Sequence, residues 1–239
     1  MKAALQDSVG TSLEPLYELY SSILKAHIVH KNAEFKRMIG VLLSTSPYRA
    51  LCDEMIAELA GVKPNLVKTW VDALSSLLYR DEEANGGIRV RHLSVYDFFV
   101  SDCCDYQVNI RDEDMQLGIA CLRVMTTQLR FNICNLEDSQ LANTDIKDLS
   151  SRVKQNVSDP LQYSCIHWLD HLCSSPTSPG ERVLALRGLK NFLEGLYPLF
   201  WIEVLSVMGM VPIGAPNLRR LLSWARVRHP RLLVDCILS

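Results

Sequence analysis

Residues 66–101 constrain the fold more than any other stretch of this 239-residue chain. A helical pattern is followed there by two short apolar-rich segments, about Leu77–Arg80 and Ile88–Arg91, with Asn-Gly-Gly at 85–87 between them. Asn and Gly tolerate the positive φ angles of a tight hairpin turn, so the pattern predicts a two-stranded antiparallel hairpin. A further helix is predicted to open at His92.

Three helices are predicted ahead of the hairpin, because apolar residues recur at three- and four-residue steps. They cover about Ala33–Ser44, Tyr48–Ala60 and Asn65–Leu77. In the first of them the residues expected to face inward are Phe35, Met38, Ile39, Leu42 and Leu43. Three helices followed by a two-stranded wing are the order of a winged helix-turn-helix, which is predicted over residues 33–101.

The regions on either side of this domain are predicted to be helical, so the fold class is mainly α. Residues 1–32 are expected to form a leading helix with Pro15 in its first turn, running to about His30. Its apolar stripe would consist of Leu16, Leu19, Tyr20, Ile23 and Leu24. Residues 102–239 are expected to form an all-helical bundle, with helices over 112–130, 149–157, 159–172, 180–193, 198–208 and 217–226.

Composition limits the compartment and the partners. The net charge of −2 disfavours a dedicated nucleic-acid binder, which normally has a strongly basic surface. The eight Cys include no CxxC pair, and residues 1–15 contain no apolar signal core, so a cytoplasmic protein with reduced thiols is expected. The apolar run Leu196–Ile213 has Glu203 at its centre, which predicts a buried core helix instead of a membrane span.

Five short patches, in this order along the chain, resemble the part of fungal NACHT-type proteins that follows their nucleotide-binding domain. These NACHT-type proteins are signal-transduction NTPases related to NOD-like receptors. The first patch is HLSVYDF at 92–98, where Val95 replaces an aromatic residue, and the second is LGIACLRVM at 117–125, with Gly118 in place of Ala. The others are RFNICNLED (130–138), LQYSCIHWLDHL (161–172) and LYPLFWIEVLSVMGMV (196–211).

The resemblance implies a regulatory role. In this family the winged helix folds back on the nucleotide-binding domain, and its His contacts the phosphates of bound ADP. That role would fall on His92, since an imidazole can donate a hydrogen bond to a phosphate oxygen. The alternative is a partly buried His92 whose ring is satisfied by a backbone carbonyl where the strand meets the helix.

The catalytic part of the family is missing from these 239 residues. A phosphate-binding loop needs a Gly-Lys dipeptide, and none of the 11 Gly is followed by Lys. We therefore expect no enzymatic activity and no cofactor.

A metal or thiol site is the first alternative. Cys165, His167, His171 and Cys173 lie within nine residues, but a helix directs the two Cys away from the two His, so no metal site is predicted. A Cys–His nucleophile formed by residues distant in sequence stays open, because its partners need only meet in space.

The main alternative is a winged-helix regulator that binds DNA. The helix before the wing would be its recognition helix, yet it offers Lys68 and otherwise Trp70, Val71, Leu74 and Leu77, which are suited to packing. The C-terminal Arg219, Arg220, Arg226, Arg228 and Arg231 form a basic patch, which is explained more simply as a solvated face. The preferred prediction is a non-catalytic regulatory module whose partner is a NACHT nucleotide-binding domain, with no membrane or nucleic acid involved.

Overall fold

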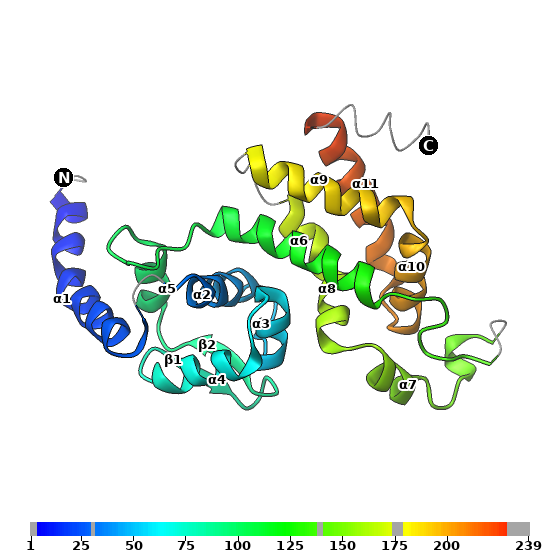
Figure 1. Cartoon of the computed structure of the whole chain (residues 1–239), viewed down its shortest axis with the longest axis horizontal. Helices are drawn as coiled ribbons and strands as arrows, with labels where there is room; N and C mark the ends of the chain where they lie inside the picture. Colours follow the sequence, from blue (N-terminus) through cyan, green and yellow to red (C-terminus); the bar gives the residue numbers. More distant parts are fainter. Residues whose placement is uncertain (1–3, 30–31, 138–140, 174–178, 229–239) are drawn as a thin grey trace. The chain divides into compact units, whose positions relative to one another are not determined.

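A computed structural model describes residues 4–29, 32–137, 141–173 and 179–228. Helices dominate, and one two-stranded antiparallel sheet is present, which confirms the predicted fold class (Figure 1). The chain divides into two compact units, Met1–Glu113 and Asp114–Ser239. The domain limits predicted at residues 32 and 101 stay predictions.

The first unit contains the elements of a winged helix-turn-helix in the predicted order. They are α2 (Ala33–Thr45), α3 (Asp53–Ala60), α4 (Pro64–Ala73), β1 (Leu78–Asp81) and β2 (Gly87–Val90). Helix α2 begins after Asn32, whose side chain accepts a hydrogen bond from the Phe35 N–H at 2.9 Å. Pro64 occupies the first turn of α4, where the missing N–H costs no hydrogen bond.

The hairpin turns at Asn85 and Gly86, whose φ angles are 53° and 74°. The predicted positive φ does not extend to Gly87, which begins β2. Gly87 is required there for space, because a Cβ atom would lie 2.7 Å from the Cβ of Ala50. The next residue, Ile88, donates its N–H to the Leu51 carbonyl at 2.9 Å, so the hairpin is fastened to the segment between α2 and α3.

The inward face of α2 is buried in the core of the winged helix. All five residues predicted to face inward are at most 3% exposed. The Phe35 ring packs edge-on against Trp70, with 5.6 Å between ring centroids, and against Tyr106, at 5.0 Å. The predicted inward face of α2 is confirmed.

Helix α1 (Ala4–His27) packs on α5 (Leu93–Val100). The rings of Tyr17 and Tyr20 lie 5.3 and 5.5 Å from the ring of Phe98. The prediction for the start of this helix was wrong, because Pro15 lies inside α1. The predicted stripe was also wrong at Leu19, which is 54% exposed. His30 lies outside the described residues.

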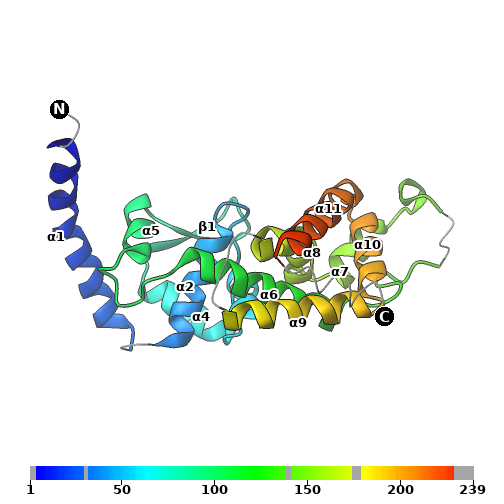
Figure 2. The same ribbon diagram turned by 90° about the horizontal axis from the view of Figure 1, so that it is seen from above.

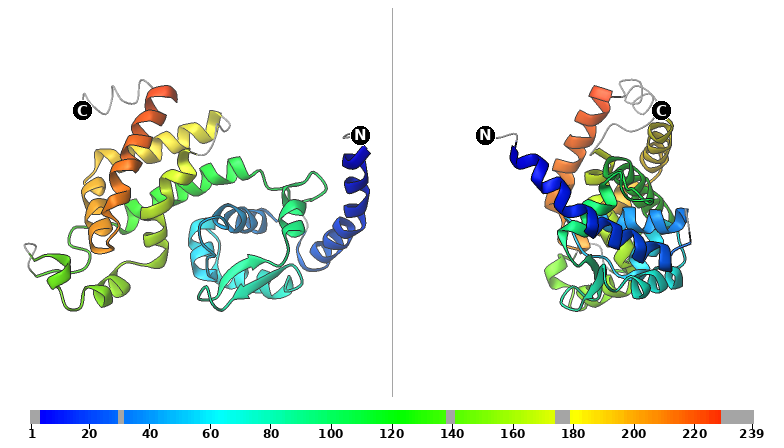
Figure 3. Two further views of the ribbon diagram at one scale, coloured as in Figure 1. Left: turned by 180° about the vertical axis from the view of Figure 1, so that it is seen from behind. Right: turned by 90° about the vertical axis from the view of Figure 1, so that its left-hand side faces the viewer.

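All regular secondary structure in the described part of the second unit is helical. It consists of most of α6 (Ile110–Gln128), the short η1 (Asn143–Asp145), α7 (Leu149–Asn156), α8 (Asp159–Cys173), α9 (Pro179–Glu194), α10 (Tyr197–Val207) and α11 (Val211–Arg228). Helix α8 contacts α10 and α11, and α9 lies alongside α6 (Figure 2; Figure 3 gives two further views). The rings of Trp168, Phe192 and Trp201 form the aromatic centre of this core.

Helix α10 is buried on one face only. Trp201 and Val204 are fully buried, whereas Leu199 is 63% exposed, so the prediction of a buried core helix is correct for one face of α10 and wrong for the other. Gly209, with a φ of 71°, interrupts the apolar run before α11. Among the described residues, no helix combines the length and apolarity needed to cross a bilayer.

Three other predicted helix boundaries were wrong. Helix α3 begins at Asp53 instead of Tyr48, because Tyr48 lies in a turn that follows α2, and Leu51, further along this segment, bonds to β2. Helix α4 stops at Ala73 instead of Leu77, since the chain must turn before β1. Helix α11 begins at Val211 and accommodates Pro216 internally, whereas the pattern had placed its start at Asn217.

Candidate functional site

His92 caps the N-terminus of α5. Its backbone is extended (φ −147°, ψ 149°), and its Nδ1 accepts a hydrogen bond from the backbone N–H of Ser94 at 3.1 Å. Helix N-termini leave N–H groups unpaired, and a short oxygen-bearing side chain usually fills this position. Here an imidazole nitrogen does so, and α5 begins one residue after the predicted His92.

A chain of hydroxyl groups continues from the His92 ring into the protein. The Ser94 Oγ lies 2.8 Å from His92 Nδ1, and the Tyr20 hydroxyl lies 2.9 Å from Ser94 Oγ. Ser94 is 6% exposed and Tyr20 is 8% exposed, whereas His92 is exposed. The ring therefore turns Nδ1 toward the protein, and its Nε2 has no hydrogen-bond partner among the described residues.

The geometry bears differently on the two predictions for His92, which are a bond to a backbone carbonyl and contact with a nucleotide phosphate. The alternative of a partly buried ring bonded to a backbone carbonyl differs from it, since the ring is exposed and accepts from a backbone N–H. The exposed Nε2 is placed where an external acceptor could reach it. Contact with a nucleotide stays a prediction.

The basic side chains of the wing are engaged within the unit. Arg80 forms ion pairs with Asp53 on α3, at 2.9 Å, and with Asp72 on α4, at 3.1 Å. Arg89 pairs with Asp81 across the hairpin at 2.7 Å. Positive charge that is already compensated attracts the phosphates of a nucleic acid only weakly.

Helix α4 uses its apolar residues for packing. Trp70, Val71 and Leu74 are at most 7% exposed, and Lys68 is exposed. A DNA-reading helix normally presents several Arg, Lys, Asn or Gln side chains to the major groove. Burial of the apolar residues leaves α4 few groups for that purpose.

The two His residues of α8 have separate partners. His171 is fully buried, with Nε2 2.7 Å from the Tyr163 hydroxyl and Nδ1 3.2 Å from Asp114 Oδ1. His167 Nδ1 lies 3.3 Å from Asp170 Oδ2. In the part of the chain that the structure describes, no group of three or more His, Cys, Asp or Glu is placed to hold a metal ion.

Burial lowers the reactivity of two of the cysteine thiols. It raises the pKa of Cys104 to about 11, and it raises the pKa of Cys165 still further. The thiolate, and not the thiol, is the nucleophile, so both side chains are inert at neutral pH. Cys103, by contrast, is exposed.

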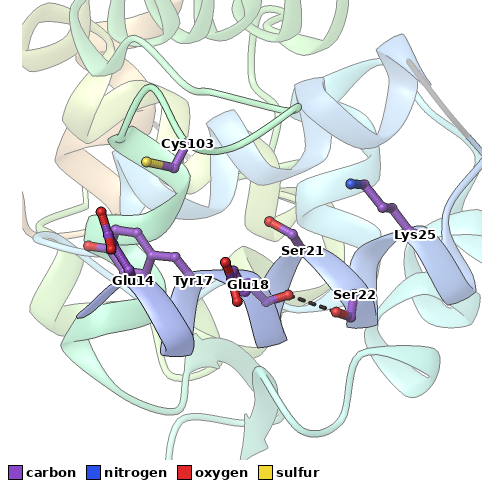
Figure 4. A pocket seen from close by; sticks show the side chains of 7 residues that line it. All are labelled: Glu14, Tyr17, Glu18, Ser21, Ser22, Lys25 and Cys103. Atoms are coloured by element: carbon purple, nitrogen blue, oxygen red, sulfur yellow. Dashed lines mark hydrogen bonds between the residues drawn. The ribbon is translucent and has the colours of Figure 1, made fainter. Parts of the chain in front are cut away.

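Cys103 faces an open groove of about 490 Å³ along α1 (Figure 4). Its other lining residues are Glu14, Tyr17, Glu18, Ser21, Ser22 and Lys25. The Ser22 hydroxyl donates to the Glu18 backbone carbonyl at 2.7 Å. No imidazole is among the described residues that line the groove, and these residues offer Cys103 no His base with which to form a nucleophilic pair.

The patches at 117–125, 130–138, 161–172 and 196–211 meet in the core of the second unit. The Glu203 carboxylate accepts hydrogen bonds from the backbone N–H groups of Asn132, at 3.1 Å, and Ile133, at 3.2 Å. A Cβ atom on Gly118 would lie 2.7 Å from the backbone nitrogen of Leu172, so α6 and α8 approach closely at this glycine. Residues distant in sequence are thus direct neighbours.

Sequence reasoning missed three of these roles. Tyr20 was assigned to an apolar stripe, Ser94 was only a motif letter, and Glu203 was only a charge in an apolar run. Periodicity identifies the buried face of a helix, but it does not show which hydroxyl or carboxylate meets which partner. The His-x-Ser spacing at residues 92–94 was the available signal, since a side chain capping a helix commonly bonds two residues ahead.

The fold and the site together define a winged helix joined to a helical region, with an exposed imidazole where the wing meets the following helix. The chain is 26% identical, over 248 aligned positions, to vegetative incompatibility protein HET-E-1 of Podospora anserina. The match covers 83% of this chain and 18% of that protein, so the chain spans less than a fifth of its relative. This distant likeness supports a relationship to fungal NACHT-type proteins at the level of the family. No family model and no solved structure matches the chain.

Proposed function

We propose that this chain is a non-catalytic, cytoplasmic regulatory module of a NACHT-type signalling switch. Its winged helix would pack on a nucleotide-binding domain that these 239 residues do not contain. Similarity to HET-E-1 along 83% of the chain carries the proposal at the level of the family. The exposed ring of His92 supports the finer role.

The geometry of His92 suits a hydrogen bond to a phosphate oxygen of the partner's nucleotide. Nδ1 is held by the Ser94 N–H, so the ring is oriented before any ligand arrives. An oriented donor loses little conformational entropy on binding, and hydrogen bonds to charged groups contribute about 1.5–3 kcal/mol.

The absence of a Gly-Lys dipeptide from the sequence supports a role without nucleotide hydrolysis. Isothermal calorimetry of the purified chain with ADP and with ATP should give no binding signal. A sub-millimolar Kd for either nucleotide would overturn this part of the proposal.

The partner can be tested directly with a separately purified fungal NACHT domain loaded with ADP. We expect the chain to bind it, and His92→Ala to weaken binding by about 10- to 100-fold, in proportion to one charge-assisted hydrogen bond. His27, an exposed residue in the last turn of α1, is the matched control, and His27→Ala should leave the affinity unchanged. Equal affinities for the two variants would show that His92 does not contribute to binding.

A gel-shift series over increasing salt concentration tests the DNA-binding alternative. The paired Arg80 and Arg89 lead us to expect no retarded band at physiological salt. Specific or steeply salt-dependent binding would favour the DNA-binding regulator.

A further inference from the structure

One assignment of donors and acceptors is consistent with the hydrogen bonds around His92. A backbone N–H can only donate, so the Ser94 N–H makes Nδ1 an acceptor. The Ser94 hydroxyl, 2.8 Å from the same nitrogen, must then donate to it as well. With its proton used in this way, the Ser94 Oγ can only accept from the Tyr20 hydroxyl.

We propose that Tyr20 is a positioning residue: it orients the Ser94 hydroxyl toward His92 Nδ1 and so strengthens the preference of the ring proton for Nε2, which the Ser94 N–H already favours. The relay runs from the Tyr20 O–H to Ser94 Oγ and from the Ser94 O–H to His92 Nδ1. It leaves the exposed Nε2–H as a donor suited to an anionic oxygen acceptor. The value of that donor to a partner rests on the function proposed above, whereas the relay itself is a property of this chain.

The relay links helix α1 to the preference of the His92 ring proton for Nε2. Tyr20 belongs to α1, while Ser94 and His92 belong to α5 and its cap. Tyr17 and Tyr20 pack against Phe98 and hold the two helices together. Separation of α1 from α5 would free the Ser94 hydroxyl to rotate, which would leave the Ser94 N–H as the remaining donor to Nδ1 and weaken the preference for a proton on Nε2.

Nitrogen-15 NMR of the full chain, with labelled histidine, measures where the proton lies. The experiment is done at about pH 8.5, which is well above the reference pKa of about 6.5 for histidine in model peptides, and His92→Gln identifies the His92 signals by their loss. We expect Nδ1 to show the resonance of an acceptor nitrogen and Nε2 that of a protonated one. Tyr20→Phe removes only the hydroxyl and should move the two resonances toward each other.

Tyr17→Phe is the matched control, since Tyr17 packs on the same Phe98 ring but lies outside the relay, and it should leave the His92 resonances unchanged. Ser94→Ala tests the middle of the relay. Adding Tyr20→Phe to Ser94→Ala should cause no further shift, because the path is already cut.

A protonated Nδ1 in the wild type would overturn the inference. Identical His92 resonances in Tyr20→Phe and Tyr17→Phe, or an undiminished effect of Tyr20→Phe in the Ser94→Ala background, would overturn it as well. No NACHT domain or nucleotide is present in this experiment. Its failure is therefore distinguishable from failure of the proposed function.

Discussion

The indole N–H of Trp201 donates to the backbone carbonyl of Cys165 at a distance of 2.8 Å. Both residues are fully buried, and they belong to α10 and α8. A buried indole N–H that finds an acceptor avoids the cost of an unpaired polar group, and its large ring fills the core. This bond and the packing of the Trp168 ring against Trp201 fix how the two helices meet.

Replacing Glu203 with Ala should destabilise the second unit by about 1–3 kcal/mol, because two backbone N–H groups lose their acceptor. Glu203→Gln keeps one carbonyl oxygen and should cost less. Urea denaturation followed by tryptophan fluorescence measures both changes. Glu194→Ala is the control, since Glu194 forms an exposed ion pair with Lys190 and its loss should change stability by less than about 0.5 kcal/mol. Equal losses of stability in Glu203→Ala and Glu194→Ala would contradict the role of Glu203 as acceptor for the two backbone N–H groups.

Gly118→Ala should destabilise this chain by about 1–3 kcal/mol. The new Cβ would meet the Leu172 backbone at 2.7 Å, and backbone cannot move aside as a flexible side chain can. Gly188→Ala in α9 is the matched control, because its Cβ would make ordinary contact with Leu122 at 3.5 Å. Since Ala favours helix over Gly, that variant should gain up to about 1 kcal/mol. Thermal melting of both variants provides the comparison, and a neutral Gly118→Ala would refute close packing here.

Iodoacetamide should label Cys103 first among the described cysteines, since its thiol is exposed. Burial raises the pKa of Cys104 from 9.0 to about 11, so its thiolate is about 100-fold scarcer at neutral pH than in an unfolded chain. Mass spectrometry of labelled peptides over time tests this order. Cys103→Ser removes the fast site and shows whether any label reaches Cys104 before unfolding. Rapid labelling of Cys104 in the native protein would contradict its burial.

Asp170 should contribute to a loss of stability in acid. The hydrogen bond from His167, and then the bond and charge of Arg220, lower the pKa of the Asp170 carboxyl in the folded state. A lowered folded-state pKa stabilises the protein above the ordinary range of Asp, about 3.9, and this contribution disappears as the pH falls through the lowered value. Unfolding free energies measured from about pH 6 to about pH 2 should therefore fall less steeply in Asp170→Asn. Asp145→Asn, an exposed control, should keep the wild-type slope.

Periodicity and turn chemistry predicted most of the fold because they depend on neighbouring residues alone. The Asn-Gly pair located the hairpin, and the three- and four-residue steps located α2 and its buried face. The same local reading failed at Tyr48 and Leu77, where partners distant in sequence decide. The hydrogen bond from Ile88 to Leu51 ties the segment after Tyr48 to the hairpin, and the start of β1 ends the helix before Leu77.

The candidate site was predictable only in part. The sequence singled out His92 as the start of a helix, and the structure places it at the cap. Its partners could not be predicted, because Tyr20 lies on a different helix, distant in sequence from Ser94. The His-x-Ser spacing accounts for the bonds between the His92 ring and Ser94, whereas no spacing rule encodes the distant Tyr20 hydroxyl that contacts Ser94.

The carboxylate of Glu203, held by the amides of Asn132 and Ile133, has a consequence for how such chains diverge. A residue that completes another segment's hydrogen bonds cannot change alone without leaving those amides unsatisfied. The Glu203 segment and the turn at 131–134 should therefore vary together among relatives, or not at all. Distant kinship in this region would then survive as linked pairs of positions, even where single positions have lost their resemblance.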